Sequence, residues 1–130
     1  MPFNAQRNDT SKFTQGTWVS IFGAEFKIAR AGNPEYEEAL EESGYRKMEK
    51  PVDKQRALYS AVATGILKDW KDVQDANGQD IKYTVDNAID VLIDNPDLAN
   101  RVLGEANDLT NYRREDIAGQ AKKRRTTSDS

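Results

Sequence analysis

The stretch Ile66–Ala88, ILKDWKDVQDANGQDIKYTVDNA, decides the expected fold. Its first residues continue an apolar helix that runs into Trp70. A polar turn centred on Asn77-Gly78 follows, because asparagine and glycine accept the positive φ that such turns require. A short extended piece from Ile81 to Tyr83 then leads to a helix capped by Thr84. This order of helix, turn, extended piece and helix predicts a mainly helical domain.

A second aromatic landmark lies upstream in Gly16–Ala31, GTWVSIFGAEFKIARA, which predicts a small β-hairpin. Alternation along its first half places Trp18 and Phe22 on one side. Gly23-Ala24 can form the turn, and the return strand carries Phe26 on one face. An isolated hairpin is only marginally stable, so this one should pack on the helices.

Four helices are expected after the hairpin. Asn33 is a good N-cap and Pro34 suits a first helical position, so the first helix should run to about Ser43. The second helix should span Lys54–Trp70, with Asp53 as its cap, because apolar residues recur there every four positions. Its width of apolar surface predicts that it lies at the centre of the fold.

Gly65 lies inside the second of these helices. A glycine costs about 1 kcal/mol relative to alanine in a helix interior. Its presence therefore suggests that another backbone or a bulky ring approaches the helix closely at this point.

The rest of the chain is consistent with a single domain, which suits a length of 130 residues. The third helix should span Val85–Asp94, and the fourth should start at Asn95-Pro96 and reach about Ala118 to Ala121. The fold class expected is mainly α, a small domain of about four helices with an N-terminal β-hairpin and flexible termini. We expect a flexible arm at residues 1–15, a single helical domain at 16–121 with its hairpin at 17–31, and a disordered basic and polar tail at 122–130.

The composition restricts the classes of function. Hydrophobic residues make up 37% of the chain and charged residues 32%, so the core must be thin and a partner could complete some apolar surface. The chain contains no cysteine and no histidine, which removes thiolate chemistry and the usual general base near neutral pH. It has no apolar run long enough to span a membrane and no secretory signal, so we expect a soluble cytoplasmic protein.

Few residues form a plausible chemical site. The polar turn at Asp75–Asp80 lacks the first and last ligands of a calcium-binding EF-hand loop. Paired carboxylates such as Glu37 and Glu41 lie on a face that periodicity assigns to solvent or to a partner. Phosphate-binding loops and nucleophile motifs are missing from the sequence. We therefore expect no catalytic, cofactor or metal site, and an enzyme is not expected.

The tail carries a basic run, Lys122–Arg125, with Arg113 and Arg114 a little upstream. Such a run can contact phosphates. However, no aromatic side chains alternate with it to stack on bases. An acidic surface on a protein partner is at least as well matched, and nucleic acid is not the expected partner.

Taken in order, the hairpin at 16–31 and the segment at 66–88 resemble the tail assembly chaperones of long-tailed, siphovirus-type bacteriophages. The resemblance runs from about Gly16 to about Gln120. It implies a protein that binds the tape measure protein, keeps it soluble, helps to recruit tail tube subunits, and is absent from the mature virion. It also implies a homo-oligomer and a mixed assembly with a longer form made by ribosomal frameshifting, of which this chain resembles the short form.

A surface for such a client should combine the acidic helix Glu35–Glu42 with apolar residues between the hairpin and the helices. Trp70 is expected in the core, whereas Trp18 fits a core or an interface equally well. The alternatives are a small nucleic-acid-linked regulator that uses the basic tail, and a structural tail or head-completion subunit. The expected partner-binding residues are Trp18, Phe22, Phe26, Tyr36 and Leu40.

Overall fold

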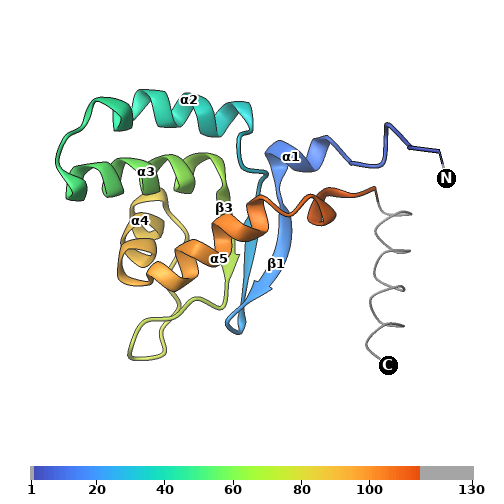
Figure 1. The fold of residues 1–130 in the computed structure, drawn as a ribbon. Coiled ribbons are helices and arrows are strands. Elements are labelled where there is room, and N and C mark those ends of the chain that lie inside the picture. The colour runs from blue at the N-terminus through green and yellow to red at the C-terminus, as the bar shows by residue number, and fades with distance from the viewer. Residues whose placement is uncertain (1, 115–130) are drawn as a thin grey trace.

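The computed structural model describes residues 2–114, and helices gather on one side of a small sheet (Figure 1). The mainly helical fold with a hairpin near its start is confirmed. Four of its helices follow the hairpin, as expected, and a short one precedes it. The elements in chain order are α1 (Ser11–Gln15), β1 (Thr17–Ile21), β2 (Ala24–Ile28), α2 (Pro34–Glu42), α3 (Pro51–Gly65), β3 (Leu67–Lys71), α4 (Val85–Asp94) and α5 (Pro96–Ala106), with 3-10 turns η1 at Tyr45–Lys47 and η2 at Leu109–Tyr112.

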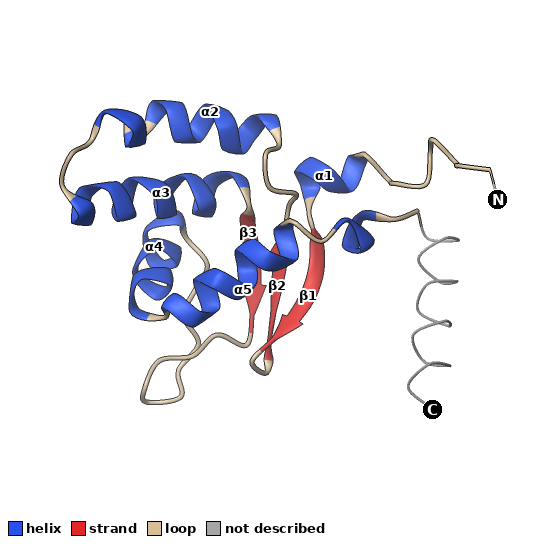
Figure 2. Ribbon diagram, viewed as in Figure 1, coloured by secondary structure: helices blue, strands red, loops and turns tan. Residues whose placement is uncertain are grey.

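The sheet has three antiparallel strands in the order β1-β2-β3 (Figure 2). The expected hairpin forms β1 and β2, joined at Phe22 and Gly23, one residue before the predicted turn. The third strand corrects the prediction that the helix continues to Trp70. The helix ends at Gly65, and Trp70 pairs with Phe26 on β2. A run of apolar residues cannot distinguish a buried helix end from a buried strand, and the free edge of β2 decides in favour of the strand.

One face of the sheet is covered by helices and holds the core. Figure 2 shows α5 crossing the sheet, while α2 lies along α3. Ile21, Phe26 and Trp70 supply the sheet side of the core, and Val62 of α3 and Leu92 of α4 supply the helix side. Side chains alternate between this core and solvent along β1 and β2, which is the pattern of a sheet with one covered face.

The predicted helix caps are partly confirmed. The side chains of Asn33 and Thr84 accept the amides of Tyr36 and Asn87, each at 3.0 Å. Asp53, however, does not cap α3, which begins two residues earlier at Pro51. Proline suits a first helical position because its missing N–H would have no partner there.

The last helix is shorter than expected. It ends at Ala106 rather than at Ala118 to Ala121, and the chain continues into the turn η2. The carboxylate of Asp108 accepts the amide of Thr110 at 3.0 Å, a local bond that starts the new turn. The turn delivers Tyr112 into the interior, where its hydroxyl donates to the carbonyl of Ile28 at 3.2 Å. The expected helix end and the tail at 122–130 lie outside the described residues.

Residues 1–15, expected as a flexible arm, contain a helix and tertiary bonds from residue 7 onward. The Asp9 amide donates to the Tyr112 carbonyl at 2.7 Å, and the Arg114 amide donates to the Arg7 carbonyl at 2.9 Å. The Phe13 ring meets the Tyr112 ring edge to face at 5.8 Å. A polar segment without periodicity can thus make backbone bonds to a distant part of the chain, and the flexibility expected of residues 1–15 stays a prediction.

Candidate partner-binding surface

Trp18 lies on the face of the sheet that the helices of residues 2–114 leave uncovered. It stands opposite Lys27 in the register of β1 and β2, and it alternates with Ile21 of the core and with Val19, which packs against the core. Its side chain is 38% exposed, and the Lys71 ammonium lies 4.2 Å from its ring centroid. An exposed indole bordered by cations is an amphipathic surface patch rather than a part of the core.

Phe22 occupies the turn between β1 and β2, where the chain reverses. Its side chain is 64% exposed, and the guanidinium of Arg101 from α5 lies 5.6 Å from its ring centroid. Phe22 has a φ of 52° and Gly23 has a φ of 83°. Tight hairpin turns require positive φ, which glycine and asparagine tolerate and phenylalanine does not. The backbone therefore presents a large apolar ring at some cost in local strain.

A pocket of about 510 Å³ opens beside this turn, between the loop that follows β3 and the junction of α4 with α5. Its apolar floor includes Ile21, Phe26, Ile81 and Leu98. The lining residues also include four exposed aspartates, which we call the acidic rim: Asp72, Asp75, Asp94 and Asp97. The sequence analysis missed this pocket, because its carboxylates come from two segments that only the fold brings together.

Three of the five expected partner-binding residues lie elsewhere. Phe26 is 3% exposed and Leu40 is 7% exposed, so their expected place on the surface is wrong. Phe26 is buried because the third strand pairs with β2 and places Trp70 beside it. Leu40 is buried because α2 packs on α3. Tyr36 is half-buried and belongs to α2, a helix that lies at the opposite end of the molecule from the hairpin turn (Figure 1). The structure therefore separates Trp18 and Phe22 from the residues of α2.

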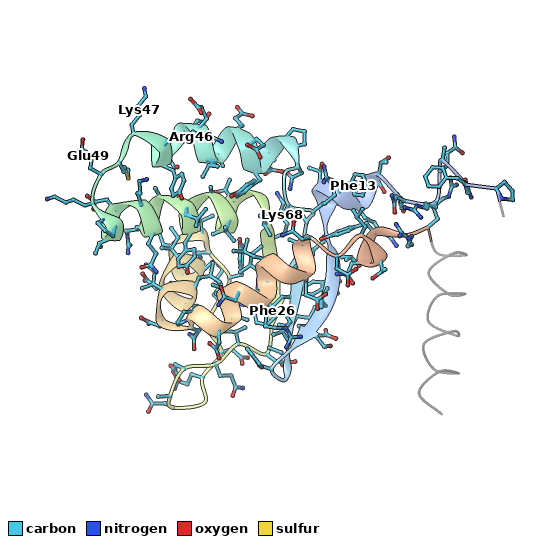
Figure 3. All side chains as sticks on the ribbon, viewed as in Figure 1. Phe13, Phe26, Arg46, Lys47, Glu49 and Lys68 are labelled. Atoms are coloured by element: carbon cyan, nitrogen blue, oxygen red, sulfur yellow. The ribbon has the colours of Figure 1, made fainter. Side chains whose placement is uncertain are left out.

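The acidic face of α2 is partly neutralised. Arg46 lies beside α2, and Lys68 lies at the start of β3 (Figure 3). The Arg46 guanidinium lies 3.0 Å from the Glu41 carboxylate, and the Lys68 ammonium lies 2.7 Å from that of Glu35. The Arg46–Glu41 pair is exposed on both sides and contributes little to stability, about 0–1 kcal/mol, whereas the Lys68 side chain is only 18% exposed. Both pairs lower the net charge of the helix surface.

Trp70 lies in the core, as expected, and anchors the loop after β3. Its indole nitrogen donates to the Ile81 carbonyl at 2.7 Å, and its ring meets that of Tyr83 edge to face at 5.2 Å. The Tyr83 hydroxyl lies within hydrogen-bond distance of the carbonyls of Ala63 and Leu67. Burial, with a smaller contribution from the Asp69 charge, raises the pKa of Tyr83 to about 12. The loop that forms one wall of the pocket is thus fixed by aromatic side chains.

The loop itself has the geometry of a polar turn. The Asp75 carboxylate accepts the amides of Asn77 and Gln79, and Gly78 has a φ of 78°. Within residues 2–114, no group of three or more histidine, cysteine or acidic side chains is placed to hold a metal ion. In the same part of the chain, no helix is long and apolar enough to cross a bilayer.

A comparison with protein families places the chain. The family model described as YdaY prophage protein matches residues 25–123, which is most of the chain. The chain belongs to the YdaY prophage protein family. It is therefore a phage-derived protein. Comparisons with curated proteins and with solved structures gave no match.

The match to the YdaY prophage protein family begins inside the hairpin, at the second residue of β2. It includes three walls of the pocket: β2, the loop after β3, and the junction of α4 with α5. Trp18 and Phe22, the two exposed aromatic residues of the hairpin, precede the matched region. The family match therefore covers the acidic rim but not these two residues.

Proposed function

We propose that this YdaY-family protein is a phage tail assembly chaperone that binds the tape measure protein, keeps it soluble and helps to recruit tail tube subunits. The observation that carries the proposal is the exposure of Trp18 and Phe22 on a hairpin whose other large apolar residues are buried or partly buried. The family match gives the protein a phage origin, which is consistent with a role in phage assembly.

The physical argument concerns how a small protein holds a long amphipathic client. Such a client must cover its apolar stripe, and a temporary partner must supply apolar surface without aggregating. Trp18 beside Lys71 and Phe22 beside Arg101 combine a ring with a cation at each position. The ring supplies contact area, while the cation keeps the surface hydrated in the free protein.

The role carries further expectations about assembly. The protein is proposed to form a homo-oligomer and to assemble with a longer frameshifted form in the cytoplasm of the infected host. It is proposed to leave before the virion matures. Mass spectrometry of purified particles tests this last point, because a structural tail or head-completion subunit would be found in them.

The main test compares Trp18→Ala/Phe22→Ala with the matched control Val52→Ala. Val52 is 75% exposed on α3, so it is also a large exposed apolar residue, but it lies outside the hairpin. Each variant is co-expressed with a phage tape measure protein, and soluble tape measure protein and binding affinity are measured.

The hairpin variant should lose at least tenfold in affinity and leave the client insoluble, while its melting temperature stays close to that of the parent. The control should behave as the parent does. Equal affinity in all three proteins would overturn the proposal.

A further inference from the structure

The pocket beside the hairpin turn combines an apolar floor with an uncompensated negative rim. Within residues 2–114, none of the ion pairs involves the four aspartates of the acidic rim. The nearby cation Arg101, one turn along α5 from Asp97, pairs with Glu105 at 3.9 Å and covers the Phe22 ring. The pocket therefore lacks a cationic counterpart in the described part of the chain.

The most cationic segment of the chain is the basic run Lys122–Arg125, four consecutive positive residues. Lysine and arginine suit this pocket in two ways. Their aliphatic stems cover apolar surface, while their charged heads remain at the wet edge. Carboxylates at that edge give charge-assisted bonds to the heads.

The basic run can reach the pocket in the same molecule. Tyr112 is bonded to Ile28, which pairs with Thr17 at the start of β1, whereas the pocket lies at Ile21, the other end of that strand. Four residues of strand span about 13 Å, and the step from Tyr112 to Arg114 adds at most about 7 Å. The Tyr112 side chain with its 3.2 Å hydrogen bond, and the step from β2 to β1, add about 15 Å, so the path is at most about 35 Å. The eleven residues from Arg114 to Arg125 extend to about 38 Å, which exceeds this path.

We propose that the basic run Lys122–Arg125 docks in the acid-rimmed pocket of its own chain. Because the run is tethered, its effective concentration at the pocket is about millimolar, so modest intrinsic affinity is enough for occupancy. The docked run covers the pocket wall that Phe22 shares with the client-facing hairpin. This inference does not depend on the identity of the client.

The test uses paramagnetic relaxation in the full chain. The protein has no cysteine, so Thr126→Cys carries a single nitroxide label next to the basic run. The readout is the intensity of the backbone amides of Ala76 and Asn95, which line the pocket. We expect both amides to lose most of their intensity relative to the reduced, diamagnetic sample, and to recover it at high salt.

The decisive comparison is Asp94→Asn/Asp97→Asn in the labelled chain. In the parent, the Asp97 side-chain oxygen accepts a hydrogen bond from the Leu98 amide at 2.9 Å. Asparagine at this position keeps that oxygen, so the helix start is preserved. The matched control is Glu38→Gln/Glu42→Gln, which removes the same charge from the exposed face of α2. The aspartate variant should regain the lost intensity, and the control should not.

Three results would overturn the proposal. The first is full intensity at Ala76 and Asn95 in the labelled parent, and the second is the same loss in the aspartate variant. The third is a loss that appears only when labelled and isotope-enriched chains are mixed, because the run would then occupy the pocket of a second copy.

Discussion

Gly65 and Tyr36 bring the backbones of α3 and α2 into direct contact. A β-carbon built on Gly65 would lie 2.3 Å from the Tyr36 Cα and 2.6 Å from its nitrogen. The close approach expected from a glycine inside an apolar helix is therefore confirmed, although Gly65 is the last residue of α3 rather than an interior one. The contact sets how α2 lies on the rest of the fold.

Gly65→Ala should destabilise the protein by about 1–3 kcal/mol, because the α2 backbone must move to accommodate the methyl group. Gly104→Ala is the matched control, since Gly104 lies in α5 and a β-carbon there meets nothing within 4 Å. The control should gain up to about 1 kcal/mol from helix propensity. Urea unfolding of both variants measures the difference, and a Gly65→Ala protein as stable as the parent would contradict the packing.

Asn33→Asp should lower the free energy of unfolding by at least about 2 kcal/mol at neutral pH. The buried Asn33 amide donates to the carbonyls of Arg30 and Gly65, at 2.6 and 2.8 Å, and a carboxylate would face both oxygens without a proton. The control is Asn95→Asp, because the exposed Asn95 amide donates to one carbonyl, that of Val91. Denaturant titrations should show a loss there of less than about 1 kcal/mol, and equal losses would refute a special role for burial.

Phe22→Asn should raise stability by about 1 kcal/mol, because asparagine tolerates the positive φ at this turn and phenylalanine does not. The same variant should weaken client binding if the exposed ring serves that purpose. Phe22→Ala separates the two effects, since it removes the ring without relieving the backbone. Thermal unfolding checks the prediction, which fails if asparagine stabilises no more than alanine does.

The protein should lose stability at alkaline pH as Tyr83 ionises. Folding raises the pKa of the Tyr83 hydroxyl from 10.0 to about 12. The stability that protonated Tyr83 contributes is therefore complete below pH 10.0 and is lost as the pH rises toward about 12. Burial also raises the pKa of Tyr112 and that of Tyr36, so the decline is shared. Tyr83→Phe should be less stable near neutrality by about 1 kcal/mol and should decline less steeply above pH 10.0. Urea unfolding across this range measures both slopes, and parallel curves would exclude Tyr83 as a source.

Local chemistry explains which predictions succeeded. Asn33 and Thr84 were recognised as caps because capping depends on one side chain and the next three residues. The hairpin was recognised from alternation and a glycine within fifteen residues. The strand β3 was missed because the periodicity of Ile66 and Trp70 fits a helix as well as a strand, and only the unpaired edge of β2 separates the two.

The candidate site was harder to predict than the fold. Trp18 and Phe26 are both aromatic residues of one hairpin, so residue type alone does not separate them. The exposure of Trp18 and the burial of Phe26 depend on how α5 and β3 pack on the hairpin. The acidic rim joins Asp72 and Asp94, which are far apart in the chain. Proximity between distant residues of this kind cannot be recognised from the sequence of any short segment.

The sequence by itself determined the helical class, the hairpin, the capped starts of α2 and α4, and the close contact at Gly65, because each depends on residues near in the chain or on one residue's stereochemistry. Tertiary structure alone decided the third strand, the docking of residues 7–15 on Tyr112, the burial of Phe26 and Leu40, and the acid-rimmed pocket. These features satisfy backbone bonds and cover apolar area between distant segments, so their free energy exists only once the segments have met.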